Sequence, residues 1–237
     1  MQTFDSRLVR AEQLTPTVRR LWFERAEGAT LDFLPGQHAR FVLPATKGAA
    51  EHAGAYSLCE PPRADGRYAI CVKQQRAHGV AEALLQASPG ALLQTVAPLG
   101  RFVLEAADSG PLVLVATGVG VAPFHAMLDQ LRELAGRADI YLLLGARRPV
   151  ELLFDPQWRA LAAEGGGRFH YRPIVSRPQA EDAWQGAVGR VDALLGELPV
   201  TLGEARAYLC GHSPMVAQLR AELTRRGLPS ARLHTDH

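Results

Sequence analysis

The sequence predicts a protein of two domains, an N-terminal antiparallel β-barrel followed by a C-terminal α/β domain with a doubly wound parallel sheet. Three observations lead to this fold class. The first half carries short apolar runs separated by Gly and Pro, as barrels and sandwiches do. The second half alternates continuous apolar runs with amphipathic segments, which is typical of buried parallel strands alternating with helices. The length of 237 residues leaves room for two small domains.

In the first half, short strands are predicted between turns. Each apolar run contains β-branched or aromatic residues and is followed by Gly, Pro or polar residues. A helix is expected at about 79–87, and a surface loop at 44–55 because that stretch is small and polar. The predicted strands are Val18–Phe23, His38–Leu43, Tyr68–Lys73 and Leu92–Val96.

In the second half, four strands buried on both faces are predicted at Leu112–Ala116, Ile140–Leu144, Phe169–Val175 and Ala207–Cys210. Helices are expected between and after them, at 123–134, 156–164, 191–198 and 213–226. The last helix would place Met215, Leu219 and Leu223 on one face, and Leu233 would close the sheet. The change of pattern at 105–111 predicts domains of 1–106 and 111–237.

The composition is typical of a globular protein, and its low net charge gives no sign of a strongly charged binding partner. Hydrophobic residues make up 47% and the formal net charge is +2, which argues against disorder and gives no sign of nucleic-acid binding. The three cysteines, Cys59, Cys71 and Cys210, are too few for an iron–sulfur cluster or an all-cysteine zinc site. No signal peptide or membrane-spanning run is found, so we expect a cytoplasmic protein. Because the eight histidines also show no HExxH motif, we expect no bound metal.

Glycine-containing turns follow the first and the fourth of the predicted parallel strands, in Thr117–Pro123 and in Cys210–Met215. Glycines let the backbone approach a phosphate, and the helix that follows offers free N–H groups and its positive dipole end. Ligands of open α/β sheets bind at the carboxyl ends of the strands, so both turns are candidate nucleotide contacts. Each turn by itself also fits a simple tight turn, and Cys210 by itself also fits a small buried hydrophobic residue.

Four motifs in a fixed order favour the nucleotide interpretation: TGVGVAP at 117–123, GARR at 145–148, VSRP at 175–178 and YLCGHSPM at 208–215. Together they resemble the NAD(P) domain of the ferredoxin–NADP reductase family, whose members carry similar GTGIAP and CGPxxM signatures. The resemblance continues through nearly the whole chain, because the first half is similar to the flavin-binding barrel of that family.

Four segments of the first half carry this second match: PGQ at 35–37, YS at 56–57, GVA at 79–81 and PLGRF at 98–102. An aromatic ring such as Tyr56 can pack on a flavin face, and the Ser57 hydroxyl can form hydrogen bonds near flavin N5. The helix start at Gly79 can hold a flavin phosphate.

The resemblance implies that Tyr56, Ser57 and Cys210 take part in catalysis. Cys210 would lie beside the nicotinamide, and Thr117 would form the floor of its pocket. The residues expected to bind cofactors are Tyr56, Ser57, Leu58, Ile70, Val72, Lys73, Arg76, Gly79, Val80, Ala81, Thr117, Gly118, Val119, Gly120, Ala122, Pro123, Gly145, Arg147, Ser176, Arg177, Cys210, Gly211, Met215 and Asp236.

Two positions depart from the family pattern. Gly54 stands where the family has the Arg of RxYS, and Ala81 stands where it has the Ser of GxS. A hydrogen bond to a charged group is typically worth ~1.5–3 kcal/mol, so either flavin binding is weakened or another residue compensates. We hypothesise that Arg76 or Lys73 faces the phosphate, with Arg40 as a further candidate; two solvated surface charges are the alternative reading.

The end of the chain also differs from the family. Similar members often finish with an acid and an aromatic residue near the flavin, whereas no Phe, Tyr or Trp ends this sequence. Asp236 is expected to stand for the acid and His237 to cover the ring.

NADPH is the favoured nicotinamide. An acidic residue at the adenosine ribose selects NADH, whereas Arg pairs with the 2′-phosphate of NADPH. Arg147 and Arg148 follow the second predicted strand, and Ser176-Arg177 follows the third, where a Ser-Arg pair is associated with NADPH in the family. Exposed loop charges are the alternative, and NADH remains an option.

The predicted function is transfer of hydride from NAD(P)H to FAD, and of electrons onward to a separate ferredoxin, flavodoxin or oxygenase partner. FAD is favoured over FMN because the small two-domain members of the family mostly use it. An acidic ferredoxin would be attracted by a basic barrel face, for which the candidates are Arg7, Arg10, Arg19, Arg20 and Arg40. Two alternatives stay open: a reductase that uses free flavin as substrate, and a non-catalytic nucleotide-binding subunit.

Overall fold

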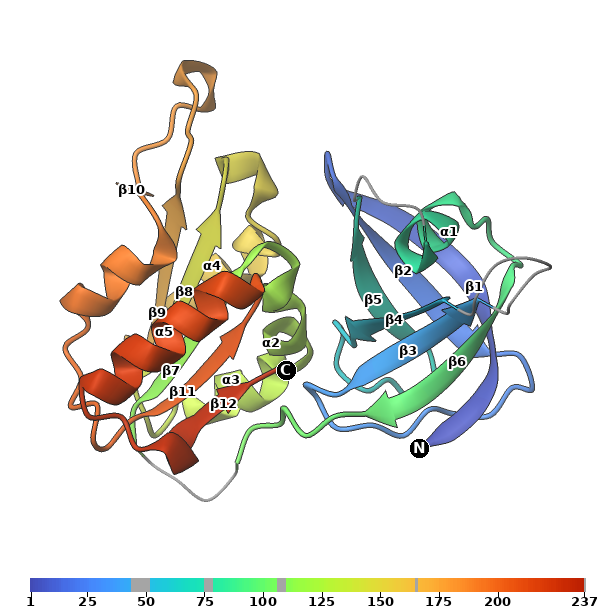
Figure 1. Cartoon of the computed structure of the whole chain (residues 1–237), viewed down its shortest axis with the longest axis horizontal. Helices are drawn as coiled ribbons and strands as arrows, with labels where there is room; N and C mark the ends of the chain where they lie inside the picture. Colours follow the sequence, from blue (N-terminus) through green and yellow to red (C-terminus); the bar gives the residue numbers. More distant parts are fainter. Residues whose placement is uncertain (44–51, 75–78, 106–109, 165, 237) are drawn as a thin grey trace. The chain divides into compact units, whose positions relative to one another are not determined.

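The computed structural model describes residues 1–43, 52–74, 79–105, 110–164 and 166–236. The chain divides into two compact units. The first comprises Met1–Leu104 together with Ala122–Met127, and the second comprises Glu105–Val121 together with Leu128–His237. Each unit is built on a six-stranded sheet (Figure 1).

The first unit is an antiparallel barrel. Its strands pair in the order β4-β3-β6-β1-β2-β5, and a bridge between Leu58 and Ile70 links the two outer strands. A seven-residue helix, α1 (Val80–Gln86), packs Val80 and Leu84 into the barrel core. The six strands are β1 (Gln2–Thr15), β2 (Val18–Arg25), β3 (His38–Leu43), β4 (His52–Ser57), β5 (Tyr68–Lys73) and β6 (Leu92–Leu99).

Alternation along the strands builds the barrel core. Leu21 and Phe23 of β2 are fully buried, and the ring of Phe23 lies 5.0 Å from that of Phe41. Hydroxyls satisfy one another inside: Ser6 contacts the Tyr68 hydroxyl and donates to Thr95 Oγ1 at 2.6 Å. Burying a polar group without a hydrogen-bond partner destabilises the fold. The hydrogen bonds among these hydroxyls therefore allow them to lie inside the barrel.

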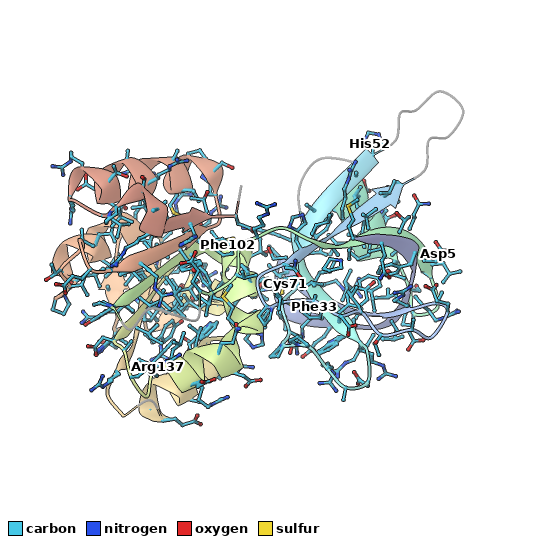
Figure 2. The ribbon with its side chains drawn as sticks, turned by 90° about the horizontal axis from the view of Figure 1, so that it is seen from below. Asp5, Phe33, His52, Cys71, Phe102 and Arg137 are labelled. Atoms are coloured by element: carbon cyan, nitrogen blue, oxygen red, sulfur yellow. The ribbon has the colours of Figure 1, made fainter. Side chains whose placement is uncertain are left out.

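Two strands of the barrel differ from the sequence prediction. β1 was not expected, because its charged residues interrupt the apolar pattern; in the structure they alternate outward while Phe4 and Leu8 point inward. The loop predicted at 44–55 is wrong for its last residues, since β4 begins at His52, whose side chain points away from the barrel (Figure 2). The backbone ladder of β4 with β3 forms although β4 is poor in apolar residues; residues 44–51 lie outside the described part of the chain.

The second unit is a parallel sheet in the order β10-β9-β8-β7-β11-β12. The chain starts in the middle at β7, moves outward to β10, and returns to add β11 on the other side of β7. The order therefore reverses between β7 and β11, which is the switch point where such sheets bind ligands. The strands are β7 (Leu112–Thr117), β8 (Ile140–Ala146), β9 (Phe169–Val175), β10 (Ala187–Val188), β11 (Arg206–Cys210) and β12 (Leu233–Thr235).

Helices cover both faces of this sheet. Figure 1 shows α5 (Ser213–Arg225) across one face, where Leu219 and Leu223 pack against Val113 and Val115. On the opposite face, Trp158 of α4 (Asp155–Glu164) stacks on Phe169 at 6.3 Å. The predicted fold class, barrel plus doubly wound parallel sheet, is confirmed.

The helix predicted over 123–134 is not continuous. A short 3-10 turn, η1 (Gly118–Val121), is followed by α2 (Ala122–Ala126) and then by α3 (Leu128–Leu134). Met127 lies at the break, and its amide donates to both Pro123 and Phe124. The segment predicted as a helix at 191–198 is a 3-10 helix, η4 (Val191–Glu197). In the parts of the chain that the structure describes, no helix is long and apolar enough to cross a membrane.

Candidate functional site

The carboxyl ends of β7 and β11 lie against each other without room for side chains. A Cβ added at Gly120 would lie 2.4 Å from the Cys210 carbonyl oxygen, and one at Gly211 would lie 2.5 Å from Thr117 Oγ1. The His212 amide donates to the same Thr117 hydroxyl at 3.3 Å. The glycines of the two predicted turns thus allow one close backbone junction at the switch point.

The rim of this junction has open space. Gly118 has a φ of +54°, and a Cβ there would meet no atom of the described part of the chain within 4 Å. Val119 is half-buried, whereas Ala122 and Pro123 are buried in α2, the segment grouped with the barrel unit. Of the TGVGVAP residues, Thr117, Gly118 and Val119 are therefore the ones with exposed surface for a ligand.

Cys210 is a buried, protonated thiol. Its side chain donates to Asp236 Oδ2 at 3.2 Å, and the residue is only 4% exposed. Burial, followed by the nearby Asp236 carboxylate, raises the pKa of this thiol well above its usual range. A thiol rather than a thiolate therefore stands at the end of β11, which leaves no charge to react with electrophiles.

The strand β12 holds Asp236 in place. It pairs in parallel with β11, and His234 stacks on Tyr208 with the ring centroids 4.3 Å apart. Burial lowers the pKa of His234, so its ring is neutral at pH 7. The predicted closing role of Leu233 agrees with this pairing, and Met215 packs on the core beneath α5. His237 lies outside the described residues.

Arginines gather at the carboxyl edge beyond β8, β9 and β10. Arg147 and Arg177 are exposed, and the Arg177 amide donates to the Arg147 carbonyl at 2.8 Å, which ties the two loops together. Ser176 is exposed beside them, and Gly145 lies below, where a Cβ would meet Thr117 and Val191.

The structure adds Arg190, which sequence reasoning missed. It follows β10 by two residues and is exposed, as Arg177 follows β9 by two. Across the described ranges, no ion pair is formed by Arg147, Arg177 or Arg190, whereas Arg148 pairs with Asp182 at 2.6 Å. Three unpaired cations thus share one sheet edge. The two-residue strand β10 carries no pattern that the sequence could have revealed.

On the barrel, Tyr56 and Ser57 form the end of β4. Both side chains are half-buried, and the Tyr56 ring meets Phe41 edge-on at 6.0 Å. Burial raises the pKa of Tyr56, which keeps its hydroxyl protonated. A Cβ at Gly54 would lie 3.0 Å from Tyr56 Cε2, so the tyrosine ring leans over the position where the family carries Arg.

Gln37 joins three of the barrel motifs. Its carbonyl accepts from the Leu58 amide at 2.9 Å, and its side-chain amide donates to the Gly100 carbonyl at 3.1 Å. Gly36 has a φ of +99°, and a Cβ there would overlap the Phe102 carbonyl oxygen. The PGQ, YS and PLGRF segments are therefore one packed structure.

Three predicted flavin contacts have no side chain to offer. Leu58, Ile70 and Val72 are each 0% exposed in the barrel core, so only their backbone is available to a ligand. Lys73, at the end of β5, is half-buried. Arg76 lies outside the described residues, and the hypothesis that it faces a phosphate stays a prediction.

The start of α1 is open. Gly79 has a φ of +141°, and no atom of the described residues lies within 4 Å of an added Cβ. The first intrahelical bond runs from the Ala83 amide to the Gly79 carbonyl, so the amides of Val80 and Ala81 precede the helical ladder. Ala81 is half-buried and has no hydroxyl to add.

The basic barrel face expected from the sequence is largely neutralised. Arg20 pairs with Glu12 at 2.8 Å and with Glu60 at 2.5 Å. Arg7 and Arg10 lie beside carboxylates as well, those of Glu24 and Glu12, and the Arg19 side chain donates to a backbone carbonyl. The carboxylates come from Glu12 on β1, Glu24 on β2 and Glu60 after β4, and the fold brings most of them to arginines that are distant in the sequence.

Comparison with known proteins agrees with this geometry. The family described as "Oxidoreductase NAD-binding domain" matches residues 114–221. The chain is 33% identical over 243 residues to "Ferredoxin--NADP reductase B" of Sorangium cellulosum, covering 99% of this chain and 97% of that protein. It is 29% identical over 208 residues to the "Anthranilate 1,2-dioxygenase electron transfer component" of Acinetobacter baylyi, covering 87% of this chain and 58% of that protein.

The chain therefore spans nearly all of the Sorangium relative but little more than half of the Acinetobacter one. Among solved structures, a ferredoxin NADP+ reductase from Neisseria gonorrhoeae with bound FAD and NADP superposes with a TM-score of 0.82 at 21% identity, covering 99% of this chain and 98% of that one. With the full-length match to the Sorangium protein, these findings show that the chain belongs to the ferredoxin–NADP reductase family of FAD- and NAD(P)-dependent oxidoreductases.

Proposed function

We propose that this protein is an FAD-dependent NAD(P)H oxidoreductase that passes electrons to a separate acceptor. The observation that carries the proposal is the glycine junction at the switch point, where Gly120 and Gly211 leave no space for a Cβ. Such a junction exposes backbone amides to a dinucleotide, as sheets of this order do at their switch points. In functional terms, we assign flavin binding to residues 1–106 and nicotinamide binding to 111–237.

The residues at the carboxyl ends of β7 and β11 are suited to bind NAD(P)H. Gly118 leaves the rim of the β7 turn open, and Thr117 is anchored by the His212 amide. The buried thiol of Cys210 offers a small neutral surface rather than a charge. We therefore assign Thr117 and Cys210 to the nicotinamide end and the TGVGVAP backbone to the phosphates.

The barrel residues fit a flavin with fewer charged contacts than the family pattern has. Tyr56 offers a half-buried ring, Ser57 a hydroxyl, and the start of α1 an open glycine with amides ahead of its ladder. The chemistry supplied by bound FAD is acceptance of hydride and its onward release as electrons. The work left to the chain is to orient the ring through Tyr56 and Ser57 and to exclude water around them.

We infer a preference for NADPH over NADH. Arg147, Arg177 and Arg190 are exposed at the edge beyond β8–β10 and form no ion pair with a described residue, and Ser176 adds a hydroxyl. A 2′-phosphate carries charge that such guanidinium groups bind in a forked geometry, whereas a ribose hydroxyl gains little from them.

For the acceptor, we propose a ferredoxin, a flavodoxin or an oxygenase component. The Sorangium relative is named for ferredoxin and the Acinetobacter relative for a dioxygenase. We propose a reducing cytoplasm as the compartment, in keeping with the three free cysteines of the described structure, Cys59, Cys71 and Cys210.

A second candidate function is reduction of free flavin as a substrate. The missing charge at Gly54 and the missing hydroxyl at Ala81 favour it, because each removes a contact that would hold flavin permanently.

Gel filtration after loading with FAD distinguishes the two functions. A bound-flavin reductase elutes yellow and oxidises NADPH with added ferredoxin, whereas a free-flavin reductase elutes colourless and oxidises NADPH only when FAD or FMN is supplied. A protein that does neither would contradict both.

A further inference from the structure

Three polar groups of the backbone immediately after β4 are held by hydrogen bonds. The Leu58 amide donates to the Gln37 carbonyl at 2.9 Å, and the Cys59 amide donates to the Ala69 carbonyl at 2.9 Å. The Cys59 carbonyl receives its bond from a side chain instead, at 2.6 Å from Nδ1 of His125. This segment directly follows Tyr56 and Ser57, so its position sets theirs.

His125 belongs to α2, the segment grouped with the barrel unit. Two nearby residues also contact barrel motifs: the ring of Phe124, on α2, lies 5.8 Å from that of Phe102, and Cε of Met127, just after α2, would lie 2.4 Å from a Cβ at Gly36. The helix therefore packs on the PLGRF and PGQ segments while His125 reaches the segment after YS. None of the roles assigned above uses this imidazole.

The tautomer of His125 follows from its partner. A carbonyl oxygen only accepts, so the proton must lie on Nδ1. The ring is 4% exposed, and burial lowers its pKa, with the Glu60 carboxylate opposing that effect. Glu60 Oε1 lies 3.7 Å from Nδ1 and is itself paired with Arg20.

The remaining charged and titratable groups of this cluster do not supply a proton to the ring. Arg20 also pairs with Glu12 at 2.8 Å, and its positive charge disfavours a charged imidazole. The Cys59 thiol is fully buried, and burial followed by its neighbour Cys71 raises its pKa, so it is neutral. The imidazole is therefore a neutral donor at pH 7.

We propose that His125 is a positioning residue for the flavin: by donating from Nδ1 to the Cys59 carbonyl, it holds the segment that carries Tyr56 and Ser57 in its binding geometry. The inference rests on the proposed function, since it assumes that this segment contacts flavin. The proposed role depends on where one N–H group lies and in which direction it points. Substitutions that place an N–H group at different positions should therefore differ in flavin affinity, whereas a role in packing alone would give them similar affinities.

Three variants test it. The side-chain amide of Asn places an N–H near the position of Nδ1, whereas that of Gln extends to the position of Nε2, and Leu fills the space without a donor. His125→Asn should bind FAD within about threefold of the wild type, and His125→Gln and His125→Leu should bind it about tenfold or more weakly. FAD affinity is measured on the full-length apoprotein by quenching of flavin fluorescence, with visible circular dichroism reporting the flavin environment.

Trp158→Phe is the matched control. It removes another buried side-chain bond to a carbonyl, from Nε1 to Leu153 at 3.1 Å, in the other compact unit. It should lower the unfolding temperature without changing FAD affinity. If His125→Leu fails to fold, the Asn and Gln variants decide, because they differ only in reach.

The outcomes distinguish failure of the positioning role of His125 from failure of the proposed function. Equal FAD affinities for the Asn, Gln and wild-type proteins would overturn the positioning role and leave the proposed function standing. Equal losses for Asn and Gln would also overturn it, since reach would then not matter. A wild-type protein that neither binds FAD nor oxidises NADPH in its presence would instead overturn the proposed function.

Discussion

Gly120→Ala tests the junction on which the nicotinamide assignment depends. The added Cβ would lie 2.4 Å from the Cys210 carbonyl oxygen and 2.5 Å from Gly211 Cα. Both neighbours are backbone atoms that cannot rotate away, and ordinary contact begins near 3.4 Å. The end of β11 must therefore move by roughly 1 Å, and overpacking of this kind typically costs about 1–3 kcal/mol.

The assay has two parts. Urea unfolding measures the lost stability, and titration calorimetry measures the dissociation constant for NADPH. We expect the substitution to raise that constant by about tenfold or more, since a displaced turn no longer presents its amides to the phosphates. Flavin affinity should change less than NADPH affinity, because Tyr56, Ser57 and the start of α1 lie in the other compact unit.

Gly196→Ala is the control within the same unit. Gly196 lies in η4, and among the residues that the structure describes none comes within 4 Å of an added Cβ there. That variant should stay within about 0.5 kcal/mol of the wild type and bind NADPH normally. Our reasoning would be refuted if Gly120→Ala matched this control in both stability and NADPH affinity.

Three further predictions concern specificity, pH and flavin affinity. Arg177→Ala and Arg190→Ala should each lower kcat/KM for NADPH by about tenfold and leave that for NADH nearly unchanged, and equal losses for the two nucleotides in steady-state assays would contradict a 2′-phosphate role. Because burial and Asp236 raise the pKa of Cys210, the folded chain keeps a proton that the unfolded chain loses above about pH 8.5. The free energy of unfolding should therefore fall as pH rises beyond that value, and Cys210→Ala should flatten the slope; an unchanged slope in urea unfolding at several pH values would count against a protonated buried thiol. Gly54→Arg should tighten FAD binding by about tenfold relative to Gly54→Ala, which adds the same Cβ without the charge, and fluorescence titrations showing equal affinities would remove the missing-charge explanation.

The parallel sheet could be predicted well because burial on both faces leaves a continuous apolar run such as Leu112–Ala116. The barrel was harder, since strands such as β1 and β2 bury one face only, although β5 is buried on both. β1 carries charges on its outer face and β4 is made of small and polar residues, so neither shows a clear pattern, and their ladders with neighbouring strands supply the stability. The helix expected at 123–134 breaks at Met127, a detail of hydrogen bonding that periodicity does not encode.

For the candidate site, glycines and motif order located the two turns that meet at the switch point. The sequence could not show which side chains and backbone groups of the site contact one another. Cys210 and Asp236 are 26 residues apart and meet only through the pairing of β12 with β11. His125 and the Cys59 carbonyl are 66 residues apart, and neither carries a motif that predicts the contact. Arg190 follows a strand of two residues, which is too short to leave a pattern.

The most direct test of the central assignment is an anaerobic titration of the FAD-loaded protein with NADPH, followed by the flavin absorption band, with NADH as the comparison. We expect NADPH to bleach the band stoichiometrically, NADH to do so more slowly or at higher concentration, and ferredoxin or another acceptor to restore it. A flavin band that neither nucleotide bleaches would contradict hydride transfer to bound flavin, whatever the nucleotide affinity.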